Sequence, residues 1–179
     1  MTVEKFNACL DRISEDREAM AVLYSEYYDR VYATALYYMR NGDFAHDVAS
    51  EVFMRLVQYR KTEQIRSPNA FLITVTKHCA LNMLKNEWKY SPLEWGESAS
   101  TQDINQDLYL KDIYSVLTEK EQQILVRHVF WGYKLNELAK QLGCSYPTIK
   151  RMYSRIKEKI KEYSLGISKG DKWDDSNKE

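Results

Sequence analysis

Apolar residues recur at steps of three and four along most of the chain, which is the period of an amphipathic helix. In the first half, this pattern predicts a short leading helix over 5–12 and longer helices over 16–40, 44–60 and 67–90. In the second half, it predicts helices over 107–117, 119–131, 135–142 and from 146 onwards. Residues 91–106 have no such period and are rich in Pro, Gly, Ser, Gln and acids, so they predict a linker.

The expected fold class is all-α, with two small helical domains joined by a flexible acidic linker. The predicted bounds of the domains are 1–90 and 107–165, and a polar tail over 166–179 is expected to be disordered. Six glycines and three prolines in the whole chain leave little turn chemistry for a β-rich fold, which supports the all-helical assignment.

Local signals mark several helix ends. Asn41 and Gly42 interrupt the second helix, and Asp43 is expected to cap the third. Thr118 with Glu121 has the spacing of a capping box, which predicts a helix start there.

The stretch 134–155 predicts two helices joined by a tight turn. An apolar stripe from Leu135 to Leu142 gives the first helix, and Gly143 follows where a helix needs a residue that tolerates positive φ. Ser145 can cap the second helix. A short helix, a glycine turn and a second helix with a basic outer face are typical of a helix-turn-helix, although an ordinary helical hairpin with a solvated face has the same pattern.

The charge of the chain is unevenly distributed, although its formal sum is zero. Residues 134–162 contain eight basic residues and three glutamates, whereas residues 87–112 contain six acids and two lysines. Zero net charge argues against a protein that coats nucleic acid unaided, but a basic segment beside an acidic connector fits a local DNA-binding surface.

A second polar stripe lies along the helix predicted over 67–90. His78, Asn82, Lys85 and Lys89 follow helical spacing, flanked by Lys77 and Asn86 and close to Trp88 and Tyr90. Amides and lysines interleaved with aromatic rings suit the binding of phosphates and unpaired bases. The plainer interpretation is a solvated amphipathic helix.

The sequence lacks the signatures of several other protein classes. Cys9, Cys79 and Cys144 are odd in number and widely spaced, so neither a disulfide framework nor a metal site is expected. No nucleotide-binding or hydrolase motif occurs, so neither an enzyme nor a cofactor is expected. Without a signal segment or a long apolar run, the predicted location is cytoplasmic, with no membrane partner.

Taken together, the two halves resemble the extracytoplasmic-function (ECF) group of bacterial sigma factors in the sigma-70 family, over roughly residues 18–163. Residues 44–53, Phe-Ala-His-Asp-Val-Ala-Ser-Glu-Val-Phe, resemble one segment of region 2 of that family, and residues 71–85 resemble another. Residues 117–150 resemble region 4. The presence of all three segments in this order, with an acidic linker between the regions, indicates this family more specifically than any one segment does.

The resemblance implies a transcription initiation factor and gives roles to matching residues. Core RNA polymerase would be bound through the clamp helices of its largest subunit, by Asp47, Ser50, Glu51 and Arg55, and through the flap of its second-largest subunit. The minus-ten promoter element would be met by Gln64, Arg66, Lys77, His78, Asn82, Lys85 and Asn86. The minus-thirty-five element would be met by Ser145, Tyr146, Thr148, Lys150, Arg151, Ser154 and Arg155. An anti-sigma protein is a further implied partner, which the sequence does not identify.

Several residues depart from the family pattern. Ser50 replaces a usual Gln, which leaves one polymerase contact open, and His78 and Asn82 replace a common Asn and Asp, so base preference cannot be transferred. Tyr146 begins the recognition helix where small residues are usual, which leaves minus-thirty-five specificity open.

Two other functions compete with a sigma factor. One is a stand-alone helix-turn-helix regulator whose N-terminal half serves as a sensor or dimerisation domain. The other is an adaptor that uses its helices only to bind proteins. The polar stripe of Asn82, Lys85 and Lys89 argues against a sensor domain, which would not need it.

Overall fold

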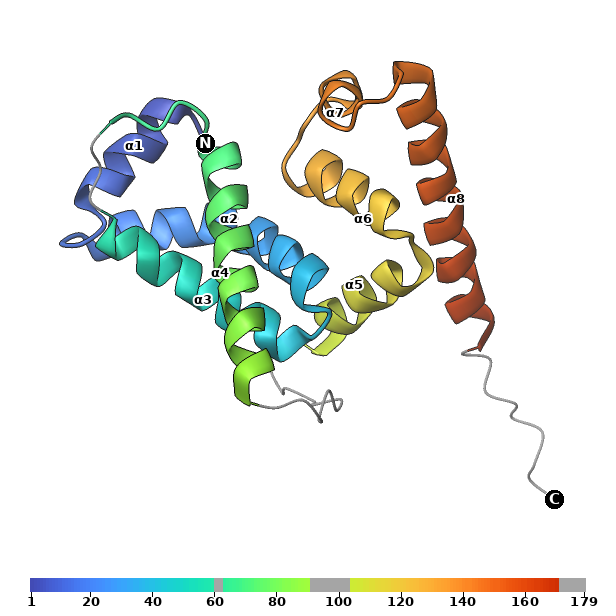
Figure 1. Cartoon of the computed structure of the whole chain (residues 1–179), viewed down its shortest axis with the longest axis horizontal. Helices are drawn as coiled ribbons and strands as arrows, with labels where there is room; N and C mark the ends of the chain where they lie inside the picture. The colour runs from blue at the N-terminus through green and yellow to red at the C-terminus, as the bar shows by residue number, and fades with distance from the viewer. Residues whose placement is uncertain (60–62, 91–103, 171–179) are drawn as a thin grey trace. The chain divides into compact units, whose positions relative to one another are not determined.

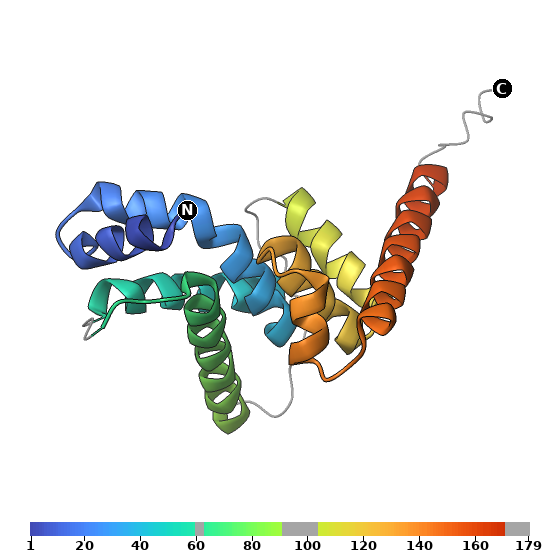
Figure 2. The same cartoon turned by 90° about the horizontal axis from the view of Figure 1, so that it is seen from above.

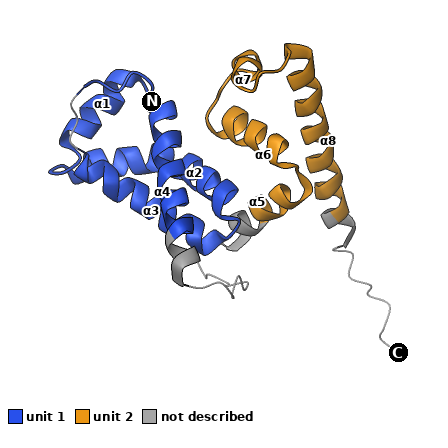
Figure 3. Cartoon of the chain, viewed as in Figure 1, with its two compact units in different colours: residues 1–107 blue, residues 108–179 orange. Residues whose placement is uncertain are grey.

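The computed structural model describes residues 1–59, 63–90 and 104–170, without the side chains of 86–90, 104–108 and 167–170. The described residues contain helices and no strands, and the chain divides into two compact units, 1–107 and 108–179 (Figure 3). The helices of unit 1 are α1 (Val3–Arg12), α2 (Arg17–Met39), α3 (Gly42–Gln58) and α4 (Pro68–Tyr90). The helical elements of unit 2 are α5 (Ile104–Val116), α6 (Glu119–Leu125), the π-helical turn η1 (Val126–Phe130), α7 (Leu135–Gln141) and α8 (Tyr146–Gly170).

In unit 1, α2, α3 and α4 pack against one another in pairs, and α1 packs against α2 (Figures 1 and 2). The residues at their contacts are almost completely buried aliphatic and aromatic side chains, among them Leu23, Val31, Leu36, Val52, Phe53, Leu56 and Leu72. This core leaves one side of α3 and one side of α4 in contact with solvent. Those two sides contain most of the predicted sites of unit 1.

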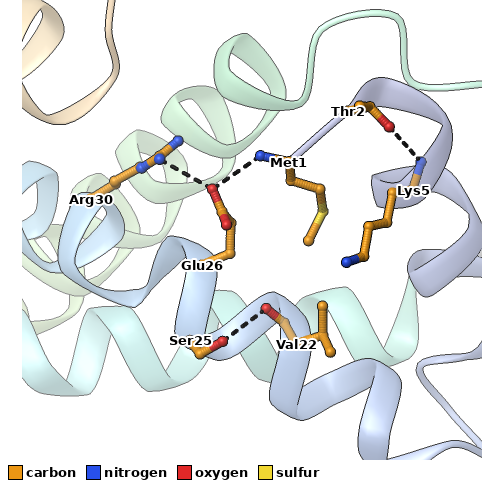
Figure 4. Close-up of polar contacts among 7 residues, drawn as sticks. All are labelled: Met1, Thr2, Lys5, Val22, Ser25, Glu26 and Arg30. Carbon is orange, nitrogen blue, oxygen red and sulfur yellow. Dashed lines mark hydrogen bonds and ion pairs between the residues drawn. The ribbon is translucent and has the colours of Figure 1, made fainter.

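The start of the chain is attached to α2 by polar contacts as well as by packing. Glu26 in α2 accepts hydrogen bonds from the amine of Met1 and from Arg30, each at 3.2 Å (Figure 4). Thr2 caps α1 by accepting a hydrogen bond from the backbone N–H of Lys5. The two residues before α1 therefore contact the neighbouring helix, through Met1, and the first turn of α1, through Thr2.

The caps explain where the helices of unit 1 begin and end. Asp16 accepts the backbone N–H groups of Glu18 and Ala19 at the start of α2, and Arg40 has a left-handed backbone (φ 58°) at its end. The prediction that Asp43 caps α3 is wrong. The Asn41 side chain accepts the Phe44 N–H at 3.2 Å, because α3 begins at Gly42 and the capping position is the residue before it.

In unit 2, α6 and α7 pack against α8, and η1 continues α6. Ile124, Trp131, Leu138, Ile149 and Ile156 are among its buried residues. The single helix predicted over 119–131 widens at its end, where the Trp131 N–H donates to the Val126 carbonyl five residues earlier. Gly132 follows with φ 70°, and it ends the helix as expected.

Two helices of the second half extend past the bounds predicted for its domain. Helix α5 starts at Ile104, inside the stretch predicted as linker, and α8 continues to Gly170, beyond the predicted end of the domain at 165. The remaining linker residues, 91–103, and the remaining tail residues, 171–179, lie outside the described residues, so their predicted disorder stays a prediction.

Candidate functional site

The outward side of α3 presents the four residues predicted to bind polymerase. Asp47, Ser50 and Arg55 are exposed, and Glu51 is half-buried. Glu51 and Arg55 form an ion pair at 2.7 Å across one helical turn, and this hydrogen bond raises the pKa of Arg55. The four side chains therefore share one face, which we call the α3 face.

Met54 also lies on the α3 face, although it was not among the residues predicted to bind polymerase. Its side chain is 54% exposed, at the helical spacing that places it beside Ser50 and Glu51. Methionine is enriched in protein–protein interfaces, whereas a single exposed apolar side chain is common on any protein surface. The signal was available in the sequence as a methionine outside the apolar stripe of the helix.

One side of α4 contains the polar stripe predicted to meet the minus-ten element. Lys77, His78, Asn82 and Lys85 are all exposed, and we call them the α4 stripe. The side chain of Asn86, the remaining predicted member on this helix, lies outside the described residues. On the opposite side, Leu72, Thr76, Cys79 and Ala80 are buried in the unit 1 core.

The loop before α4 contains the other two predicted minus-ten residues. Gln64 and Arg66 are exposed, and Ile65 between them is half-buried. The backbone of Ile65 is hydrogen-bonded to the side chain of Asn7 in α1. Sequence reasoning missed Asn7, since a single asparagine in a short helix gives no sign of a partner far along the chain.

Helices α7 and α8 form the predicted helix-turn-helix of unit 2. The turn follows from Gly143, which has φ 63°, and from the Cys144 N–H, which donates to the Ala139 carbonyl at 2.9 Å. Ser145 then caps α8, because its hydroxyl accepts the Thr148 N–H at 3.3 Å. The expected order of helix, glycine turn and capped second helix is confirmed.

The predicted minus-thirty-five residues lie at and after the start of α8. The exposed residues among them are Tyr146, Lys150, Arg151, Ser154 and Arg155. Half of the surface of Tyr146 (50%) is accessible to solvent. Ser145 and Thr148 differ from the others because their hydroxyl oxygens lie 2.8 Å apart in a mutual hydrogen bond. Ile149 and Ile156 are completely buried on the opposite side. The exposed side of α8 is therefore a polar and cationic surface.

The later part of α8 is attached to the rest of unit 2 by polar contacts. Lys159 donates a 2.7 Å hydrogen bond to Glu121 in α6, and the hydroxyl of Tyr163 donates to Asp112 in α5 at 2.9 Å. Glu121 also accepts the backbone N–H of Thr118, so one carboxylate both caps α6 and binds α8. The sequence predicted the first of these roles and missed the second.

The electrostatics of Glu121 follow from these contacts. Burial raises the pKa of its carboxyl, but the hydrogen bonds from Lys159 and Thr118 and the charge of Lys159 outweigh burial. The pKa therefore lies below its ordinary value, and the group is a carboxylate near neutral pH. The hydrogen bond from Tyr163 to Asp112, together with burial, raises the pKa of that phenol.

A search of the described residues finds no cluster of three or more side chains suited to hold a metal ion. Among the same residues, none of the helices is long and apolar enough to cross a membrane. The exposed surfaces described above offer charges, hydrogen-bonding groups and an apolar side chain to a binding partner.

Comparison with known proteins gives matches over both units. The family model "Sigma-70 region 2" matches residues 23–90, and the family model "Sigma-70, region 4" matches residues 108–160. The chain is 22% identical over 158 residues to the ECF RNA polymerase sigma factor SigX of Bacillus subtilis, a match that covers 77% of this chain and 79% of that relative. A solved structure of the RsbN–BldN complex aligns with 86% of this chain and 98% of its own, at 22% identity and a TM-score of 0.37, too low to compare folds.

Proposed function

Because the chain belongs to the sigma-70 family of RNA polymerase sigma factors, with the region 2 and region 4 arrangement of the ECF group, we propose a division of labour between its units. Unit 1 binds core polymerase and opens the promoter at the minus-ten element, and unit 2 binds the minus-thirty-five element. The observation that supports this most directly is that each matched region has its own exposed polar surface, backed by its own buried core.

The α3 face suits a protein partner better than DNA. It contains Asp47 and Glu51, whose negative charges repel phosphates, and Met54 is exposed on the same face. Arg55 is paired with Glu51 and adds no free positive charge. We therefore assign this face to core polymerase. The resemblance to the family implies the clamp helices of the largest subunit as its specific contact, and the flap of the second-largest subunit as a further contact of the protein.

The α4 stripe and the adjacent loop suit unpaired DNA. Lys77 and Lys85 can contact phosphates, while Asn82 and His78 offer hydrogen bonds to base edges. Taking a base out of the stack costs a few kcal/mol, and the energy of polymerase binding together with these capture contacts offsets that cost. Strand opening is therefore assigned to unit 1.

The exposed side of α8 suits double-stranded DNA. A helix of this size fits the major groove, where Lys150, Arg151 and Arg155 can reach phosphates or guanine edges. The hydroxyl and ring of Tyr146 add a hydrogen bond or an apolar contact. The neutral charge of the whole chain agrees with this assignment, since polymerase supplies much of the electrostatic attraction to DNA.

The experiment that tests the proposal is transcription from a genomic library by core polymerase with and without this protein, followed by mapping of the transcript starts. We expect starts that depend on the protein and share sequence elements near minus ten and minus thirty-five. Cleavage footprints of the protein alone provide the control. A dimer that protects a palindrome without polymerase would contradict the proposal and favour a stand-alone regulator. Polymerase and promoter DNA also imply a cytoplasmic location, and an anti-sigma partner stays a prediction.

A further inference from the structure

Helix α1 is fixed in the core of unit 1. Phe6 is completely buried, and its ring meets Tyr27 of α2 edge-on at 5.6 Å between centroids and Phe71 of α4 at 6.4 Å. Phe71 belongs to the first turn of α4, directly after the loop that contains Gln64 and Arg66. Asn7, the next residue of α1, is therefore held close to the start of α4, the helix that contains most of the proposed minus-ten residues.

Asn7 pairs with both backbone groups of one loop residue. Its side-chain Nδ2 donates to the Ile65 carbonyl at 2.9 Å, and its Oδ1 accepts the Ile65 N–H at 2.9 Å. Nδ2 also donates to the Val3 carbonyl in α1, so both amide hydrogens and the amide oxygen have partners. Asn7 is only 3% exposed and Ile65 is half-buried, so the Asn7–Ile65 pairing is partly shielded from water.

The pairing fixes the backbone between the two proposed minus-ten residues of the loop. Gln64 and Arg66 flank Ile65, and their side chains are exposed while Ile65 is half-buried. When one peptide N–H and one carbonyl of a residue are both bound, the residue cannot rotate about its backbone without losing a hydrogen bond. The directions in which the Gln64 and Arg66 side chains leave the loop are set by the same contact.

We propose that Asn7 is a positioning residue for promoter opening: through Ile65 it keeps Gln64 and Arg66 in the arrangement that captures the minus-ten strand. The inference rests on the proposed function and adds to it a residue that lies outside the matched region 2, residues 23–90. Asn7 itself contacts no DNA, since it is buried. Its effect reaches DNA only through the loop.

The alternative is that Asn7 only stabilises unit 1, and a double-mutant cycle separates the two roles. Asn7→Ala, the pair Gln64→Ala with Arg66→Ala, and the combination of all three are compared with wild type in complex with core polymerase. Strand opening is measured by permanganate reactivity of promoter thymines, at a temperature where every variant is folded by circular dichroism. We expect Asn7→Ala to slow opening about five-fold in the wild-type background and to have no further effect once Gln64 and Arg66 are truncated.

Two further variants protect the test from a simple folding defect. Asn7→Leu keeps the branching of the side chain but cannot hydrogen-bond to Ile65 or Val3, and it places no charge in a buried position, so we expect a similar loss of opening. Val31→Ala removes completely buried atoms from α2, which does not contain the loop. We expect this control to lower stability, and any slowing of opening that it causes to be the same with and without Gln64 and Arg66.

The outcomes distinguish the inference from the function on which it rests. If Asn7→Ala slows opening equally with and without Gln64 and Arg66, or if Asn7→Leu opens promoters at the wild-type rate, the positioning role is wrong while the sigma-factor function stands. If wild-type protein with core polymerase opens no promoter, the proposed function itself is wrong, and the positioning role is wrong with it.

Discussion

The two units present their polar surfaces in different ways. In unit 1, the α3 face and the α4 stripe lie on helices whose inner sides are packed by buried aliphatic and aromatic residues, such as Phe53 and Leu72. In unit 2, α8 contributes two completely buried isoleucines, and it is attached further along by Lys159 to Glu121 and by Tyr163 to Asp112. The α3 face and the α4 stripe depend mainly on the packing behind them, whereas the orientation of α8 depends also on charge and hydrogen bonds.

This difference matches what the proposed tasks require. Strand opening needs a rigid surface that stays in place while DNA is distorted, and a close-packed core supplies that rigidity. Recognition of a preformed duplex needs the correct orientation of one helix, which a few polar contacts can set. We therefore expect loss of a buried ring to weaken the unit that contains it and loss of the Glu121 contacts to weaken unit 2, while loss of Arg151 or Asn82 separates duplex binding from strand opening.

Phe53→Ala should have the largest effect, a loss of about 3–5 kcal/mol from the free energy of unfolding of unit 1, because it empties a buried aromatic site next to Tyr24 and Tyr28. Amide hydrogen exchange measured for each unit checks this, with unit 2 expected to keep its protection. Trp131→Ala is the mirror-image control, expected to affect unit 2 alone. A loss of protection in both units from either substitution would show that they do not fold separately.

Glu121→Ala should cost unit 2 about 2–3 kcal/mol, since it removes hydrogen bonds to a charged group and leaves Lys159 without this partner. Chemical denaturation, monitored by amide hydrogen exchange in unit 2, measures the loss. Glu137→Ala is the matched control: Glu137 also accepts a backbone N–H at the start of its helix, from Lys134, but it is exposed. Equal losses from the two substitutions would mean that the contact with α8 adds nothing.

Arg151→Ala should weaken promoter-specific binding by about 1–3 kcal/mol without changing the fraction of bound complexes that open. The reason is that an exposed cation on α8 contributes to duplex binding and not to strand separation. Footprinting measures binding, and permanganate reactivity measures opening. Lys120→Ala removes an equally exposed charge from α6 and serves as control. An unchanged footprint for Arg151→Ala would contradict this placement of the recognition helix.

In contrast to Arg151→Ala, Asn82→Ala should impair strand opening and leave duplex binding unchanged. The expected loss of free energy for opening is about 1 kcal/mol, the scale of one hydrogen bond. We expect the closed complex to form normally and the permanganate reactivity of promoter thymines to fall, because Asn82 is assigned to the opened strand. Lys5→Ala, which changes an exposed residue of α1, is the control in the same unit. Wild-type permanganate reactivity in Asn82→Ala would remove this residue from the minus-ten surface.

Acidification should destabilise unit 2 through Glu121, with the smallest effect of these changes. The pKa of this carboxyl is lowered in the folded protein, so its contribution to stability is complete above the ordinary value of about 4.3 and is lost as the pH falls through the lowered pKa. Thermal unfolding followed by the NMR amide signals of unit 2 between neutral and acid pH measures this. Glu121→Gln should reduce the acid-dependent loss, and an unchanged pH profile in that variant would contradict the assignment.

The helices and the outward faces could be predicted from the sequence because both follow from local spacing. The exposure of Ser50 and Arg55 on α3, or of Asn82 and Lys85 on α4, needs only the period of the helix and the identity of the apolar residues. The cap of α3 was predicted at Asp43 but lies at Asn41, two residues earlier. Asn and Asp both cap helices, so the sequence alone does not distinguish these neighbouring candidates.

The contacts that orient these faces could not be predicted, because they join residues far apart in the chain. Asn7 and Ile65 are separated by 58 positions, and Glu121 and Lys159 by 38. No local pattern marks such pairs. The widened turn η1 was missed for another reason: it differs from an α-helix in which carbonyl each N–H reaches, and that choice changes the apolar period too little to be detected over five residues.

The burial of Phe6 has a practical consequence for work on fragments of this protein. The family match to region 2 begins at residue 23, after the whole of α1 and the first turns of α2. A fragment cut at that boundary would expose the rings of Tyr27 and Phe71 that Phe6 now covers. The compact unit therefore begins before the region matched by the family model, and a protein shortened to that match would expose apolar surface that favours aggregation.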